Sequence, residues 1–286
     1  MSYLGNSYNS NRVQTPLTIE QIARYAPSAM ATRPHESRSE RYTYIPTVNI
    51  IEGMIKAGFQ PFSASQSRSR IEGKSEFTKH MIRFRHESVG MQSLAVGEVA
   101  PEVVLINSHD GTSTYNLISG LFVKVCTNGL MVSESEISAV KVMHKGDILQ
   151  NVIEGSYRLI EDSTRVLGTV QTWGQLQLSA GEQNALADAA RTLRFADAEG
   201  KVSTPITAAQ LLQPRRYEDN KPDLWNTFNR VQENVIKGGL RAIQRDANGR
   251  RLRAISTRQV RGIDHDVKLN RALWQLAERM AELKAA

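Results

Sequence analysis

Residues 101–126, PEVVLINSHDGTSTYNLISGLFVKVC, decide the fold of this chain because they predict a β-hairpin. Two runs rich in Val, Ile, Leu and Phe flank His109-Asp110-Gly111. Asp-Gly between apolar runs supplies the positive φ angles that a tight turn between antiparallel strands requires. His109 and Asp110 could also form a general base, but a turn explains this pair of residues more simply.

Two further strands are predicted before this hairpin, at residues 61–70 and 77–87, because polar and apolar residues alternate in both. If these strands pair, Ile82 and Phe84 form an apolar underside. The opposite face carries basic side chains from both strands: Arg68, Arg70, Lys79, Arg83 and Arg85. This face is either a polyanion-binding surface or an ordinary solvated outer face.

Helical patterns lie on both sides of the predicted sheet. Thr18 and Thr47 mark the starts of two helices before it, and Ser179 with Glu182 forms a capping box after it. Apolar stripes at helical spacing predict further helices at residues 146–173, 179–195, 223–237 and 266–283. The expected fold class is therefore α+β, with an N-terminal helix plus an antiparallel β-meander, followed by a mainly helical C-terminal half.

This pattern suggests three parts: a disordered tail at 1–15, an α+β domain with an antiparallel sheet at 16–145, and a helical region at 146–286. The helical region would carry a flexible basic arm at 237–261, KGGLRAIQRDANGRRLRAISTRQVR. The arm contains a single acid, Asp246, and eight basic residues: Lys237, Arg241, Arg245, Arg250, Arg251, Arg253, Arg258 and Arg261.

The charge of the chain is concentrated around this arm. The chain has 36 basic and 29 acidic residues, a net charge of +7. Residues 201–286 alone contain 17 basic and 9 acidic residues, whereas residues 1–200 contain 19 and 20. Such a localised positive field favours a polyanionic partner, above all nucleic acid, whose binding depends strongly on salt. The other interpretation is a solubilising loop without a partner.

Arg215, Arg216 and Tyr217 form a second candidate contact next to the arm in sequence. The two guanidinium groups could bind phosphates, and the tyrosine ring could stack on an unpaired base. A place for Tyr217 in the core is an equally good interpretation.

Other chemistry is weakly represented in this sequence. A single cysteine, Cys126, excludes a disulfide framework, and the six histidines show no metal-ligand spacing. We therefore expect no cofactor, no metal and no catalytic residues. The polar N-terminus lacks a signal-peptide pattern and no apolar run is long enough to cross a membrane, so a cytoplasmic protein is expected.

Several long blocks resemble the YafZ/YfjQ/YubP-like family of plasmid and prophage proteins, which share a domain of unknown function of the DUF932 type. They are HESRSERYTYIPTVNII at 35–51, GFQPFSASQSR at 58–68, INSHDGTSTYNLISGLFVKVCTNGL at 106–130, HKGDILQNVIEGSY at 144–157 and PRRYEDNKPDLWNTFNRVQENVIKGGL at 214–240. The resemblance implies a bacterial protein of a mobile element. It brings no activity and no catalytic residues.

The expected function is DNA binding without catalysis, with single-stranded DNA preferred and strand annealing by a homo-oligomer as one form of it. The order of helix, β-meander and helices is similar to Rad52-type annealing proteins, although their specific motifs are absent and fold analogy does not establish function. One alternative is an anti-defence protein that inhibits a host defence or repair enzyme. A second alternative is a metal-dependent nuclease, although no spacing selects its carboxylates.

Overall fold

A computed structural model describes residues 15–36, 44–69, 71, 73–89, 99–123, 129–131, 139–142, 147–246 and 248–285. The chain divides into two compact units, residues 1–164 and 165–286. The division falls inside the long helix α3 (Ile148–Gln175), whose two ends belong to different units. The sequence placed this boundary at residue 146, where the periodicity changes from strand to helix, and not inside the helix.

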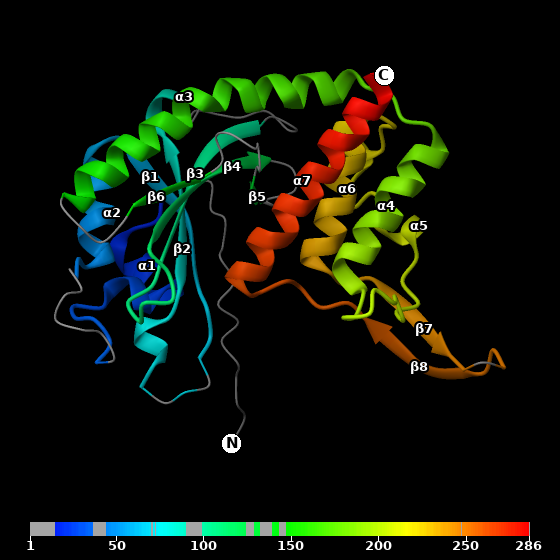
Figure 1. The fold of residues 1–286 in the computed structure, drawn as a ribbon, viewed down its shortest axis with the longest axis horizontal. Coiled ribbons are helices and arrows are strands. Elements are labelled where there is room, and N and C mark those ends of the chain that lie inside the picture. Colours follow the sequence, from blue (N-terminus) through cyan, green and yellow to red (C-terminus); the bar gives the residue numbers. More distant parts are fainter. Residues whose placement is uncertain are drawn as a thin grey trace. The chain divides into compact units, whose positions relative to one another are not determined.

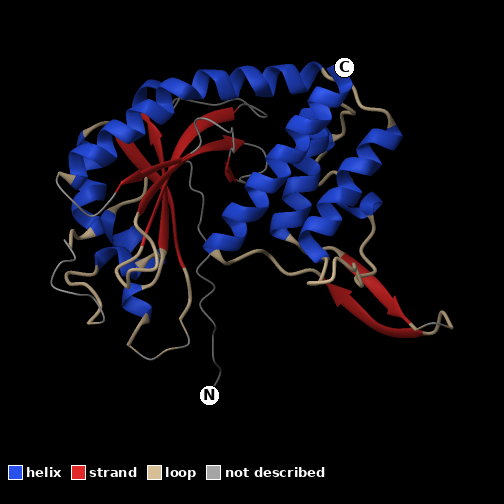
Figure 2. Cartoon of the chain, in the orientation of Figure 1, coloured by secondary structure: helices blue, strands red, loops and turns tan. Residues whose placement is uncertain are grey.

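Unit 1 is built on an antiparallel sheet (Figures 1 and 2). Its strands are β1 (Phe59–Gln66), β2 (His80–His86), β3 (Val99–Asn107), β4 (Tyr115–Val123), β5 (Gly129–Met131) and β6 (Ala139–Val142). Strands β1 to β5 are neighbours in chain order, and β6 pairs with β4 beside β5. The predicted α+β class with an antiparallel meander is confirmed.

The hairpin that joins β3 to β4 forms as predicted. Its turn contains Gly111 at φ 77°, and the Asp110 carboxylate accepts hydrogen bonds from the Thr112 amide and hydroxyl at 3.0 and 2.6 Å. The side chain of Asp110 therefore stabilises the turn itself.

One face of the sheet packs against helices α1 (Ile19–Tyr25), α2 (Thr47–Lys56) and the first part of α3. Ile82 and Phe84 lie on this face, as predicted, and are fully buried. The helices contribute Ile22, Ile50, Ile51, Met54, Ile148 and Val152 to the same core. Burial of this apolar surface is what holds the sheet and helices together.

The opposite face of β2 is not the exposed basic surface that the sequence suggested. Arg83 is fully buried and Arg85 is 5% exposed. Both donate from Nε to the carboxylate of Glu102, at 2.6 and 3.0 Å, and Arg83 also donates to the carbonyl of Leu130 at 2.7 Å. The Arg85 guanidinium lies between the rings of Phe62 and Phe122, 4.1 and 3.6 Å from their centroids.

These contacts make Arg83 and Arg85 structural residues of the sheet. Gly120 provides the necessary space, because a Cβ atom there would lie 2.9 Å from an Arg83 guanidinium nitrogen. Burial lowers the pKa of Arg85, and Glu102 opposes that effect. Strand alternation showed that the arginines share a face, but it could not show that this face is also covered.

Unit 2 contains the end of α3, helices α4 (Ala180–Phe195), α5 (Ala208–Leu211), α6 (Leu224–Lys237) and α7 (Ile263–Ala285), and a two-stranded hairpin, β7 (Arg241–Arg245) with β8 (Arg251–Ser256). Ser179, Thr207 and Asp223 each accept a hydrogen bond from a backbone amide at the start of a helix. The predicted helical C-terminal half is confirmed, with the hairpin as an addition.

An aromatic cluster forms the core of unit 2. It unites the chain's three tryptophans, Trp173, Trp225 and Trp274, with Phe228. The ring centroids of Trp173 and Trp274 are 4.5 Å apart, and those of Trp173 and Phe228 are 5.7 Å apart. The cluster fixes α6 and α7 against the end of α3 and so positions the loop between them, which forms the hairpin.

Candidate nucleic-acid interface

The basic segment 237–261 forms a β-hairpin where the sequence suggested an irregular flexible arm. Strands β7 and β8 pair from Arg241 opposite Ser256 to Arg245 opposite Arg251. At the turn, the Asp246 carboxylate accepts hydrogen bonds from the Asn248 and Arg250 amides, at 3.0 and 2.8 Å. The single acid of the segment therefore closes its turn.

The hairpin is fixed to the helices at its root. The backbone of Thr257 bonds that of Gly239 and Leu240, at 2.8 and 2.9 Å, and the Val260 amide donates to the carbonyl of Ile236 at 2.8 Å. From α5, the Gln210 side chain donates to the carbonyl of Arg241 at 2.8 Å. The hairpin thus continues from the C-terminal end of α6, and it extends away from the helices of its own unit (Figure 1).

Gly238 makes this root possible. Its φ is 64°, and a Cβ atom at this position would lie 2.7 Å from the carbonyl carbon of Arg258. Residues other than glycine rarely adopt this conformation. Neighbouring Gly239 has a φ of 83°, but a Cβ atom there would meet no other atom within 4 Å.

These two glycines allow a matched test. We expect Gly238→Ala to lower the free energy of unfolding by about 3 kcal/mol, because it adds a steric clash to the backbone strain. Gly239→Ala should cost only the backbone strain, about 1 kcal/mol. Calorimetric unfolding of both variants measures the difference, and equal losses would contradict the close approach at Gly238.

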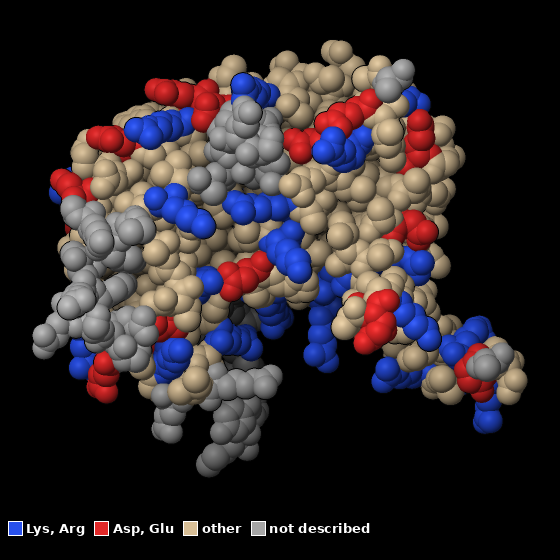
Figure 3. Space-filling model, in the orientation of Figure 1, with Lys and Arg blue, Asp and Glu red and all other residues tan. Residues whose placement is uncertain are grey.

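Seven of the predicted contact residues lie exposed on the hairpin and the segment that follows it: Arg241, Arg245, Arg250, Arg251, Arg253, Arg258 and Arg261. Figure 3 shows Lys and Arg side chains gathered over the hairpin. Within the described part of the chain, none of the seven forms an ion pair. Their charges are therefore not neutralised within the protein, so their positive potential is available to a polyanion.

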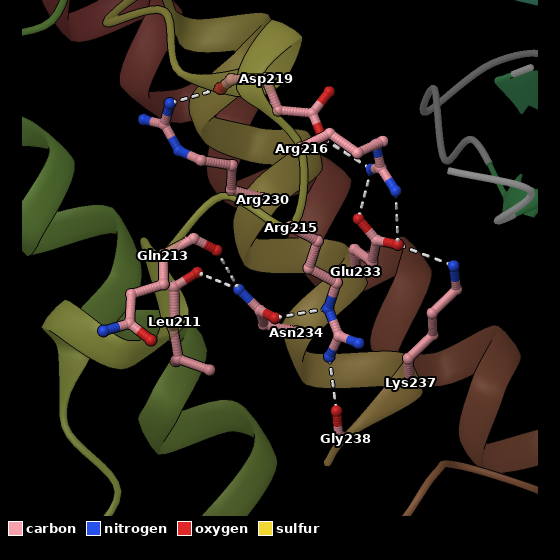
Figure 4. A network of polar contacts seen from close by, with 10 residues as sticks. All are labelled: Leu211, Gln213, Arg215, Arg216, Asp219, Arg230, Glu233, Asn234, Lys237 and Gly238. Atoms are coloured by element: carbon pink, nitrogen blue, oxygen red, sulfur yellow. Dashed lines mark hydrogen bonds and ion pairs between the residues drawn. The ribbon is translucent and has the colours of Figure 1, made fainter. Parts of the chain in front are cut away.

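Arg215, Arg216 and Lys237 form contacts within the protein that the sequence did not indicate, although Arg215 remains exposed (Figure 4). Arg216 forms two hydrogen bonds with the buried carboxylate of Glu233, and Lys237 Nζ lies 2.7 Å from the same carboxylate. Burial disfavours the charged form of Glu233, but these hydrogen bonds outweigh it and lower the pKa of the carboxyl.

The neighbouring contacts join this loop to the hairpin root. Arg215 donates to Asn234 Oδ1 at 2.9 Å and to the carbonyl of Gly238. Asn234 in turn donates to the carbonyls of Leu211 and Gln213, both at 2.9 Å. The buried polar face of α6 therefore organises the loop, and the two arginines that the sequence suggested as phosphate ligands stabilise the fold through these contacts.

Tyr217 follows these two arginines and is 91% exposed, which excludes the core interpretation. It begins a short 3-10 helix, and its carbonyl accepts a hydrogen bond from the Asn220 amide at 3.1 Å. The backbone that carries this ring is thus anchored by the Arg215 and Arg216 contacts. An exposed aromatic ring on an anchored loop fits a stacking contact.

The remaining predicted residues lie in unit 1. Arg68 is exposed, and Lys79 is partly exposed just before β2. Arg70 lies outside the described residues. Of the described residues on the predicted basic face, Arg83 and Arg85 are buried and only Arg68 and Lys79 reach solvent, so the hairpin is the stronger candidate.

A buried polar network in unit 1 was not anticipated from the sequence. The hydroxyl of Thr47 lies 3.0 Å from Nε2 of His80, 3.0 Å from Nε2 of His109 and 3.2 Å from Nδ2 of Asn107. All four side chains are fully buried. The sequence suggested that Thr47 caps α2, but the cap position is Pro46, and Thr47 joins α2 to β2 and β3.

A proton on Nδ1 of His80 gives a consistent set of donors and acceptors in this network. Nδ1 of His80 lies 3.3 Å from the carbonyl of Thr78, which can only accept, and 3.1 Å from the hydroxyl of Ser28, which can accept or donate, so a proton on this nitrogen is compatible with both contacts. Nε2 of neutral His80 then accepts the single hydroxyl proton of Thr47, and Asn107 and His109 donate to the same oxygen. Burial, followed by the proximity of His109, lowers the pKa of His80 to about 3.

Removing this hydroxyl tests the network. We expect Thr47→Val to lower the free energy of unfolding by about 3 kcal/mol, because several buried groups lose their common partner. Thr47→Ser keeps the hydroxyl and removes one methyl group, which should cost about 1 kcal/mol. Urea unfolding followed by far-UV circular dichroism compares the two, and a valine variant as stable as the serine variant would contradict this arrangement.

Neither metal chemistry nor a membrane span finds support in the described ranges. No three His, Cys, Asp or Glu side chains among these residues are grouped to hold a metal ion. No helix in them combines the length and apolar character needed to cross a membrane.

Comparison with known proteins identifies relatives over nearly the whole chain. Residues 34–274 match the family described as a domain of unknown function (DUF932). The chain is 48% identical to UPF0380 protein YafZ and 47% identical to UPF0380 protein YfjQ, both from Escherichia coli (strain K12), over 95% of this chain and 94% of each relative. No solved structure matches. The chain belongs to the DUF932 family.

Proposed function

We propose that this DUF932 protein binds DNA through the exposed arginines of the β7–β8 hairpin and of the segment that follows it, and that it prefers single strands. The observation that carries the proposal is the set of seven exposed arginines without an ion pair among the described residues. Phosphate groups would supply the missing negative charges, and release of counterions from the DNA would drive association.

The form of the hairpin supports this proposal. A two-stranded ribbon anchored at its root keeps its arginines in a fixed arrangement, so less conformational entropy is lost on binding than with a disordered arm. Arginine is also suited to phosphate because its planar guanidinium can donate two hydrogen bonds at once.

Tyr217 supports the preference for single strands. Its ring is 91% exposed, on a loop that Arg215 ties to the carbonyl of Gly238 at the hairpin root. Unpaired bases offer a face on which such a ring can stack, whereas bases within a duplex already stack on each other. No metal ion or catalytic group takes part in this mechanism.

The test is fluorescence anisotropy with labelled single-stranded and double-stranded oligonucleotides of one sequence, across a salt series. Tight, salt-sensitive binding that favours the single strand is expected. Absence of binding at low salt would refute the proposal. Polyglutamate serves as a competitor, because equal competition per charge would point to an acidic protein partner instead of DNA.

Annealing is a further part of this proposal, and it requires a homo-oligomer that presents a continuous path for the strand. Light scattering after size-exclusion chromatography, with and without oligonucleotide, measures the assembly. Mixing of complementary labelled strands measures annealing. If the protein is monomeric and does not change the annealing rate, strand annealing is excluded.

A further inference from the structure

The β7–β8 hairpin presents apolar side chains among its arginines. Ile243 is 41% exposed and Leu252 is 59% exposed, although both are large aliphatic residues. A threonine at either position would keep the strand propensity without placing apolar surface in water. The two residues therefore call for an explanation beyond formation of the strands.

The two side chains lie on the same face of the ribbon. Ile243 pairs with Ala254, so these two residues share a face, and Leu252 lies two residues from Ala254 along β8. Residues 251–253 contain the β-bulge of the hairpin, with Leu252 as the extra residue opposite no partner. Bulges of this kind redirect side chains and are frequent at functional positions.

Arginines flank this apolar pair. Arg241 and Arg245 lie two residues before and after Ile243, on the same face and about 7 Å away along the strand. All three residues are exposed, whereas Ala242 and Gln244, on the other face, are only partly exposed. One face of the ribbon thus combines positive charge with apolar surface.

We propose that Ile243 and Leu252 form a contact surface for unpaired nucleobases, while the arginines beside them hold the phosphates. This inference rests on the proposed DNA binding and adds the residues that select single strands. An unpaired base exposes apolar ring surface that can pack against aliphatic side chains. A duplex keeps that ring surface inside its base stack, so Ile243 and Leu252 would gain little apolar contact from a duplex.

The experiment compares a double variant, Ile243→Thr with Leu252→Thr, with the unchanged protein. The ligands are a labelled single-stranded oligothymidine and an abasic oligonucleotide with the same number of phosphates. The unchanged protein should bind the abasic strand about tenfold more weakly, because the base contacts are lost. The double variant should distinguish the two strands by a smaller factor, because only the proposed Tyr217 contact to the bases remains, and its salt slope should remain unchanged.

Leu283→Thr is the control, because Leu283 is also exposed in unit 2 but lies on α7, away from the hairpin in sequence. It should behave as the unchanged protein does. The inference is overturned if the double variant still distinguishes the two strands by the same factor. A lower salt slope in the double variant would also overturn it, since the variant would then have altered the phosphate contacts. If neither the unchanged protein nor any variant binds either strand, the proposed DNA binding itself fails.

Discussion

Replacement of Arg250, Arg251 and Arg253 with alanine is expected to weaken binding of single-stranded DNA by about 100-fold at 0.1 M salt. All three side chains are exposed on the β7–β8 hairpin. Each phosphate contact to a single strand contributes about 0.7 to the slope of log affinity against log salt. Loss of three contacts should therefore reduce the slope by about 2. The loss of affinity should be nearly the same for DNA strands of different sequence.

The control removes the same charge elsewhere. Arg158, Arg165 and Lys201 are exposed and lie outside the hairpin, so their replacement by alanine also changes the net charge of the chain from +7 to +4. If both triple variants lose affinity equally, only the total charge matters. If the hairpin variant keeps the original affinity and slope, the hairpin is not the binding surface.

Acid is expected to destabilise unit 1 through His80. The pKa of this buried histidine is about 3 in the folded protein, against an ordinary value of 6.5. The unfolded chain therefore takes up a proton below pH 6.5 that folded His80 does not accept. The contribution of neutral His80 to the free energy of unfolding is complete above pH 6.5. It declines as the pH falls toward 3, by a total on the order of 5 kcal/mol.

Urea unfolding across this pH range, followed by far-UV circular dichroism, measures the effect. The difference between the unchanged protein and His80→Gln isolates the contribution of this side chain, because the other titrating groups are common to both. Stability of the unchanged protein should decline more steeply, by about 1.4 kcal/mol per pH unit. His265→Gln is the comparison at an exposed histidine whose pKa is also lowered, first by partial burial and then by Arg194 and Lys268, and it should change the pH dependence less than His80→Gln does. Parallel curves for His80→Gln and the unchanged protein would contradict the neutral buried histidine.

Local patterns predicted the fold well, because the forces that form turns and helix ends act between neighbouring residues. Asp110 with Gly111 determined the hairpin, and the capping box of Ser179 and Glu182 determined the start of α4. Asn248-Gly249 carries the same kind of turn signal between alternating residues. The β7–β8 hairpin could therefore have been predicted, but the many basic residues in this segment favoured its interpretation as an irregular arm.

The roles of the arginines could not be predicted in the same way. Arg83 and Arg253 both lie in strands with alternating neighbours, yet Arg83 is buried against Glu102 and Arg253 is exposed. Arg216 is stabilised by Glu233, 17 residues later in the chain. Such pairings depend on tertiary contacts between distant segments, which the spacing of a single sequence does not encode. The same limit applied to Thr47 and His109, whose contact joins α2 to the end of β3.

The aromatic core of unit 2 gives the protein a built-in spectroscopic label. Because Trp173, Trp225 and Trp274 all lie in that unit, intrinsic tryptophan emission reports on its packing alone. His80 lies in the other unit, which has no tryptophan. Acid that unfolds unit 1 should therefore lower the circular dichroism signal before it shifts the emission spectrum. A simultaneous change in both signals would mean that the two units, which share helix α3, unfold as one cooperative structure.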